Sequence, residues 1–209
     1  MTWLDGLRLV AITDLDVFTP DALVTRWEEV AQRARTGTVA IDLRAPTRTA
    51  REVLHLGVRL KEIAQQWGQR LFVNDRLDIA RLLEADGMHL REDSVSSIDA
   101  RRIHPQTQIL RACHRVNDVA SIDADAVLLS PVLEARKGNT ALGLTALSAA
   151  KGARKSIRLF ALGGIDAARA ASCIEAGADG VAAIGAVFGG SVGNVEALLT
   201  ALRVAREGS

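Results

Sequence analysis

The chain has 209 residues, with 26 Lys and Arg against 25 Asp and Glu. This length is sufficient for one full hydrophobic core, and a net charge of +1 gives no support to a nucleic-acid or membrane-surface partner. Two cysteines exclude a disulfide scaffold and a four-cysteine zinc site. We find no signal-like segment and no apolar run long enough to span a bilayer, so we expect a cytoplasmic protein without a membrane partner.

Short apolar runs alternate along the chain with longer amphipathic segments. The apolar runs are rich in Val, Leu, Ile and Ala, which is typical of parallel strands buried on both faces. We expect eight strands, at Leu7–Asp14, Val39–Arg44, Arg70–Asp75, Asp86–Leu90, Gln108–His114, Asp125–Pro131, Ile157–Ile165 and Asp179–Phe188.

An amphipathic segment follows each expected strand. The expected helices are Pro20–Arg35, Thr49–Trp67, Leu77–Ala85, Ser97–Ile103, Val116–Ile122, Leu144–Arg154, Ala167–Ala176 and Val195–Glu207. Because each crossover must return over the sheet, this alternation predicts parallel strands. Eight such units predict a (β/α)₈ TIM barrel, formed as a single domain by residues 1–209.

Three turns from a helix into a strand share one pattern, in which small residues surround Asp86, Asp125 or Asp179. We interpret this repeat as the turn chemistry of helix-to-strand connections, which lie at the end of a barrel away from its active site.

Polar residues gather where the expected strands end, and in a parallel barrel this edge carries the active site. Gly163-Gly164 precedes a helix, and Gly185 ends the last expected strand. Glycines let a backbone approach a ligand closely, and free N–H groups there bind phosphate. We therefore predict a phosphate site at these glycines; two tight turns without a ligand are the alternative.

Asn74-Asp75-Arg76 ends the third expected strand, and Asp93 lies in the loop after the fourth. Asp75 and Asp93 could together hold Mg²⁺ against a diphosphate. Alternatively, Asp75 caps the following helix or pairs with an arginine.

His114 is the strongest general acid or base candidate, because it ends the fifth expected strand and an imidazole exchanges protons near neutral pH. A histidine that only bonds a neighbouring loop is the alternative. Cys113 precedes it, and strand alternation would point the two side chains in opposite directions, against a Cys–His pair. Arg136-Lys137 follows the sixth expected strand and could hold phosphate from a loop, or could be a solvated surface.

Two segments resemble the central signature of the thiamine-phosphate synthases and their relatives, the thiazole tautomerases. They are residues 72–80, which contain Asn74-Asp75-Arg76, and residues 85–90, which read Ala-Asp-Gly-Met-His-Leu. Further pieces follow in the family's order, so the resemblance covers nearly the whole chain. They are Ala112-Cys113-His114, Ser130-Pro131-Val132-Leu133, Leu142-Gly143-Leu144 and residues 161–165 and 176–184.

The resemblance implies a barrel that takes a small phosphorylated substrate, thiazole phosphate. The synthases join it to a pyrimidine diphosphate with Mg²⁺ and release pyrophosphate, whereas the tautomerases move a proton within the thiazole and imply no metal. The matching positions imply diphosphate contacts from Arg44 and Asn74 and a metal ligand at Asp75. They also imply thiazole phosphate held at Gly163-Gly164. His114 matches a histidine carried by both branches.

The departures from the synthase pattern fall mostly on the diphosphate half. The lysine expected shortly after Arg44 is absent, His-Leu-Gly-Gln becomes His89-Leu90-Arg91-Glu92, and the serine expected near the end of the last strand is Gly185. We therefore place a tautomerase first. The alternatives are a Mg²⁺-dependent synthase, in which Arg136 and Lys137 replace the missing lysine, and a non-catalytic phosphate-binding barrel. The sequence leaves the oligomeric state open, and a homo-oligomer is compatible with it.

Overall fold

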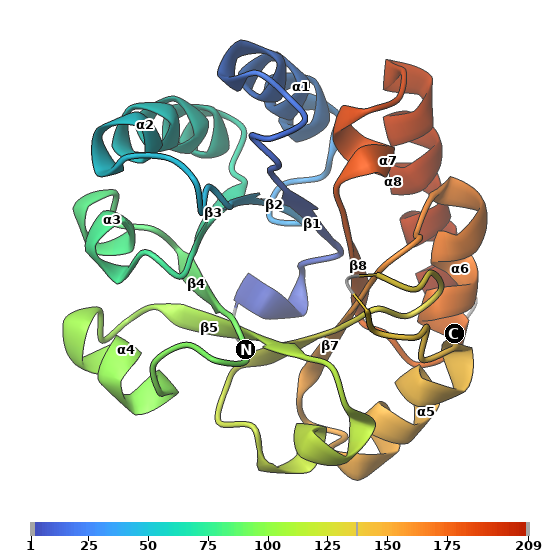
Figure 1. Ribbon diagram of the computed structural model, residues 1–209. Coiled ribbons are helices and arrows are strands. Elements are labelled where there is room, and N and C mark those ends of the chain that lie inside the picture. Colours follow the sequence, from blue (N-terminus) through green and yellow to red (C-terminus); the bar gives the residue numbers. More distant parts are fainter. Residues whose placement is uncertain (1–2, 137, 208–209) are drawn as a thin grey trace.

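The computed structural model describes residues 3–136 and 138–207. Eight parallel strands close into a barrel in the order β1 to β8, so each strand pairs with its neighbours in sequence and β8 pairs with β1. The helices surround this barrel, as Figure 1 shows from one end. The expected (β/α)₈ TIM barrel is thereby confirmed. The strands are β1 Leu9–Ile12, β2 Val39–Leu43, β3 Arg70–Asn74, β4 Gly87–Leu90, β5 Gln108–Cys113, β6 Ala126–Leu129, β7 Arg158–Leu162 and β8 Gly180–Ala183.

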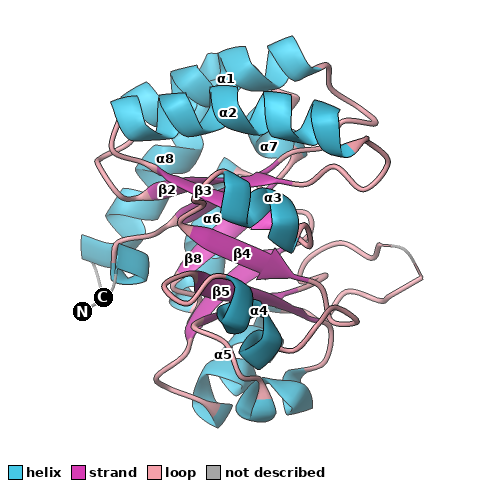
Figure 2. Cartoon of the chain, turned by 90° about the vertical axis from the view of Figure 1, so that its left-hand side faces the viewer, coloured by secondary structure: helices cyan, strands magenta, loops and turns pink. Residues whose placement is uncertain are grey.

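The helices cover the outer face of the barrel and pack on an aliphatic layer (Figure 2). They are α1 Pro20–Arg33, α2 Ala50–Gln66, α3 Leu77–Leu82, α4 Ser97–Ile103, α5 Leu144–Ala153, α6 Ala167–Glu175, α7 Gly185–Phe188 and α8 Val192–Glu207, with the 3-10 helices η1 Trp3–Asp5 and η2 Val116–Ser121. Thr49 and Glu52 form a reciprocal capping box that fixes the start of α2.

Alternation along each strand divides the core in two. One set of side chains faces the helices, and a smaller set, which includes Ala40, Phe72 and Phe160, fills the interior of the barrel. Leu4 of η1 packs into that interior cluster from the amino end, so the start of the chain closes this end. The site must therefore lie at the opposite, carboxyl end, to which the strand arrows point in Figure 2.

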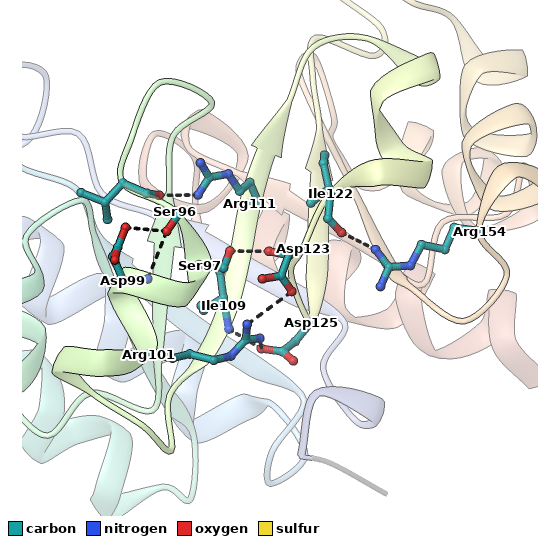
Figure 3. A network of polar contacts seen from close by, with 11 residues as sticks. Ser96, Ser97, Asp99, Arg101, Ile109, Arg111, Ile122, Asp123, Asp125 and Arg154 are labelled. Carbon is teal, nitrogen blue, oxygen red and sulfur yellow. Dashed lines mark hydrogen bonds and ion pairs between the residues drawn. The ribbon is translucent and has the colours of Figure 1, made fainter.

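The repeated aspartates of the helix-to-strand turns hold neighbouring strands together. The Asp125 carboxylate accepts the backbone N–H of Ile109 at 2.8 Å and pairs with Arg101 at 2.9 Å, a network drawn in Figure 3. Asp86 and Asp179 accept the N–H groups of Leu71 and Leu159 in the same way. This geometry agrees with our interpretation of the repeat as turn chemistry.

Several predicted elements differ from the structure; α3, for example, ends at Leu82 rather than Ala85, and α8 begins at Val192 rather than Val195. The segment after β5 is the 3-10 helix η2 rather than an α-helix. β7 ends at Leu162 rather than Ile165, because Gly163 and Gly164 take positive φ. β8 ends at Ala183, and the apolar residues that follow it are α7, which buries Val187 and Phe188 against the barrel; apolarity alone does not separate a strand from a short buried helix.

Candidate active site

A cavity of about 240 Å³ opens at the carboxyl end of the barrel. It brings together half of the predicted site: Arg44, Asn74, His114, Arg136 and Gly163 all line it. Arg91 also lines it, whereas no Asp or Glu is among the described residues on its walls. The side chains of Arg44 and Arg136 have no hydrogen-bond or ion-pair partner among the described residues, and with no carboxylate in the lining they favour an anionic ligand.

A second hollow of about 290 Å³ adjoins this cavity and shares Arg136 and Gly163 with it. Gly163 and Gly164 have φ of 109° and 70°, and a Cβ on Gly163 would lie 3.0 Å from Pro131 Cα. Gly185 lines the same hollow as the first residue of α7, where backbone N–H groups have no acceptor within the helix. We name these three glycines the glycine cup; its backbone can donate to a phosphate.

Glu134 borders the glycine cup, and its charge is balanced there. Arg169 of α6 contacts the Glu134 carboxylate at 2.7 Å and donates to the Gly164 carbonyl at 2.7 Å. The hydrogen bond to Glu134 raises the pKa of the Arg169 guanidinium. The pair therefore fixes the loop after β6 against the cup.

His114 follows β5 and faces the cavity. Its Nδ1 lies 2.7 Å from the Ser130 carbonyl oxygen and 3.3 Å from Ser130 Oγ. Because a carbonyl oxygen only accepts, Nδ1 donates, and in the neutral ring Nε2 then carries the lone pair. A proton acceptor is thus held beside the cavity.

The two thiols are not nucleophiles of this site. Cys113 is buried in the outer core, away from His114, as strand alternation predicts. Burial raises the pKa of the Cys113 thiol, and it raises that of Cys173 to about 11.

A polar cluster lies at the wall of the cavity, and sequence reasoning gave a role to only one of its members, Asn74. His89 Nδ1 is 2.6 Å from the fully buried Asp42 carboxylate and 2.9 Å from Asn74 Nδ2. The signal was present in strand alternation, since Asp42 is two residues from the inward-facing Ala40. Asp42 thereby orients the ring of His89, which lines the cavity.

The predicted metal ligands are already paired with a cation. Arg91 Nε lies 2.5 Å from Asp75 Oδ2 and 3.3 Å from Asp93 Oδ1. Asp75 also takes φ of 56°, and its carboxylate accepts the backbone N–H of Arg91. Across residues 3–136 and 138–207, no three His, Cys, Asp or Glu side chains are grouped so that they could hold a metal ion. These residues do not fit a resident Mg²⁺, and the pairing of Asp75 with an arginine is the alternative we left open.

Asp75 and Asp93 line neither the second hollow nor the main cavity. Asp93 lines a recess beside it, together with Arg91 and His114. Lys137 lies outside the described residues, so its phosphate contact stays a prediction.

Comparison with known proteins decides the family. The family model described as thiamine monophosphate synthase matches residues 9–187. The chain belongs to the thiamine monophosphate synthase family. This confirms the resemblance, and with it membership of an enzyme family of thiamine biosynthesis.

Individual members of the thiamine monophosphate synthase family align over most of the chain. A thiamine-phosphate synthase of Methanoculleus marisnigri is 39% identical over 80% of this chain and 81% of its own. One from Moorella thermoacetica is 37% identical over 73% and 76%. The structure of a thiamine phosphate pyrophosphorylase from Pyrococcus furiosus superposes with a TM-score of 0.86 at 25% identity, covering 98% of this chain and 99% of that one.

A 3-hexulose-6-phosphate synthase structure, 21% identical with a TM-score of 0.69, shares the fold. Among the described helices, none has the length and apolar character needed to cross a membrane.

Proposed function

We propose that this protein is a thiamine-phosphate synthase, which joins a thiazole phosphate to a pyrimidine diphosphate. The observation that carries the proposal is the pair of adjoining anion sites, the glycine cup and the arginine-lined cavity. A substrate with one phosphate and a second with a diphosphate would require two such sites side by side. The named relatives favour this alternative over the tautomerase that the sequence placed first.

In this reaction the thiazole nitrogen uses its lone pair to form a bond to the pyrimidine's methylene carbon. The bond from that carbon to the diphosphate oxygen breaks, and pyrophosphate leaves with the electron pair. Arg44 and Arg136 would neutralise the charge that grows on the leaving group, because a guanidinium forms strong, paired hydrogen bonds with phosphate. The glycine cup would hold the thiazole phosphate so that the nitrogen faces the carbon.

A thiazole tautomerase is the second candidate, and His114 is the observation that favours it. Its Nδ1 is tied to the Ser130 carbonyl, so Nε2 can take a proton from a ligand carbon and return it elsewhere on the ring. This reaction has no leaving group and needs neither a diphosphate site nor a metal.

One chromatographic experiment separates these candidates. The purified protein receives the thiazole phosphate carboxylate, the pyrimidine diphosphate and Mg²⁺, and the products are followed over time; a parallel reaction contains excess chelator. Thiamine phosphate as a product, formed with release of pyrophosphate and of the thiazole carboxylate as CO₂, supports the synthase. Tautomerised thiazole as the sole product contradicts the synthase and supports the tautomerase. If neither product forms, the result supports a non-catalytic barrel.

The protein would work in the cytoplasm on small phosphorylated substrates, with no nucleic-acid partner. This follows from its near-neutral charge and from the biosynthetic family to which it belongs.

A further inference from the structure

Arg91 pairs with Asp75, the residue that the resemblance implies as a ligand of a divalent cation. Its guanidinium contacts both the Asp75 and the Asp93 carboxylates, and its backbone N–H donates to Asp75 as well. Both carboxylates make their closest contact with Nε, on one edge of the guanidinium. The terminal nitrogens carry further N–H donors.

The same residue belongs to the cavity wall. Arg91 lines the cavity with Arg44 and Arg136, and the side chains of these two have no hydrogen-bond or ion-pair partner among the residues that the structure describes. Asp75 and Asp93 are not among the residues that line the cavity, whereas Arg91 is. The cation that faces the cavity is therefore covalently part of the chain.

We propose that Arg91 takes the place of the divalent cation, so that this chain binds a diphosphate group without metal. A guanidinium provides directed, charge-assisted hydrogen bonds to phosphate oxygens, which can replace the charge of a metal ion though not its octahedral geometry. The assignment of this group to the diphosphate of a pyrimidine substrate rests on the proposed function.

The test measures inorganic pyrophosphate binding by calorimetry, once in excess EDTA and once in Mg²⁺. The wild-type protein should bind with similar affinity in both. Arg91→Ala should lose at least about tenfold in EDTA, the equivalent of one charged hydrogen bond. Mg²⁺ should restore binding in this variant, because Asp75 and Asp93 are then free to hold the ion.

A second readout follows the metal itself. In electron paramagnetic resonance, Mn²⁺ should stay free with the wild-type protein and become bound with Arg91→Ala. Arg102→Ala is the matched control: Arg102 also pairs with an aspartate, Asp99 at 2.7 Å, but lies on α4 outside the cavity, and its loss should change neither readout. If the alanine variant is unstable, Arg91→Lys replaces it in both measurements, because lysine keeps the positive charge but loses the planar set of guanidinium donors.

Wild-type binding of pyrophosphate that requires Mg²⁺, absence of binding in both buffers, or tight Mn²⁺ binding by the wild-type chain would each overturn the proposal. These outcomes are separate from those of the proposed function. Pyrophosphate binding that requires Mg²⁺, together with thiamine phosphate as a product, would refute metal-free binding and leave the synthase intact. Pyrophosphate binding in EDTA without any thiamine phosphate as product would refute the synthase and leave metal-free binding intact.

Discussion

One half of the site is formed by backbone groups and the other by side chains. The glycine cup after β7 and β8 is built from backbone, and its geometry depends on positive φ at Gly163 and Gly164. The half after β2, β3 and β4 is built from charged side chains, among them Arg44 and Arg91. Backbone sites are constrained by the fold that surrounds them, whereas long side chains can be exchanged with little effect on packing.

This difference agrees with most of the departures from the synthase pattern, although Gly185 of the glycine cup is itself one of them. The glycines of the Gly163-Gly164 pair match that pattern, and a side chain there would strike the loop after β6. The lysine lost after Arg44 and the arginine gained at position 91 belong to the loops after β2 and β4. The fold can thus be kept while the chemistry of one half changes.

We expect the largest effect from removal of the His114 imidazole, which tests whether the protein transfers a proton on the thiazole. If the protein moves a proton on the thiazole, His114→Ala should lower the tautomerisation rate about 10²–10⁴-fold, the usual contribution of a general acid or base. Coupling to the pyrimidine should fall less, because that step depends on the leaving group. The measurement is the rate of each product by chromatography.

His55→Ala is the control, since His55 is an exposed residue of α2. It should leave both rates unchanged. A tautomerisation loss of less than about tenfold in His114→Ala would show that His114 only bonds the Ser130 carbonyl.

A side chain at Gly163 tests the backbone half. In Gly163→Ala the new Cβ would lie 3.0 Å from Pro131 Cα and 3.1 Å from Val132 N, and φ would remain unfavourable for alanine. Movement of the cup should weaken thiazole phosphate binding about 10- to 100-fold, the equivalent of one lost hydrogen bond to a charged group. Calorimetry measures the affinity, and thermal unfolding should show a loss of stability as well.

Gly152→Ala is the matched control. Gly152 lies in α5 with open space around it, so alanine there should stabilise the helix by about 0.5–1 kcal/mol and leave the affinity unchanged. Wild-type affinity in Gly163→Ala would mean that the cup does not bind phosphate.

The barrel and the end of it that carries the site could be predicted from the sequence. Strands and helices have distinct hydrophobic periods, and parallel strands joined by helices follow general rules of connection. It also indicated His114 and the glycine pair, since both stand where strands end. It missed the pairing of Arg91 with Asp75 and Asp93, because a charged residue on a loop has many possible partners and only the fold shows which ones it contacts. Asp42 was missed for a similar reason: its partner His89 is 47 residues away.

Arg44 tests the side-chain half, and the expected effect is the smallest of the three. Its guanidinium has no partner among the described residues, so Arg44→Ala should leave the unfolding temperature unchanged. Pyrophosphate binding should weaken about tenfold, while thiazole phosphate binding is retained. Arg136→Ala should weaken the binding of both pyrophosphate and thiazole phosphate, because Arg136 lines both hollows. Equal losses of both ligands in Arg44→Ala would contradict the division of the cavity, since a single shared anion site would then account for the three arginines and the glycine cup together.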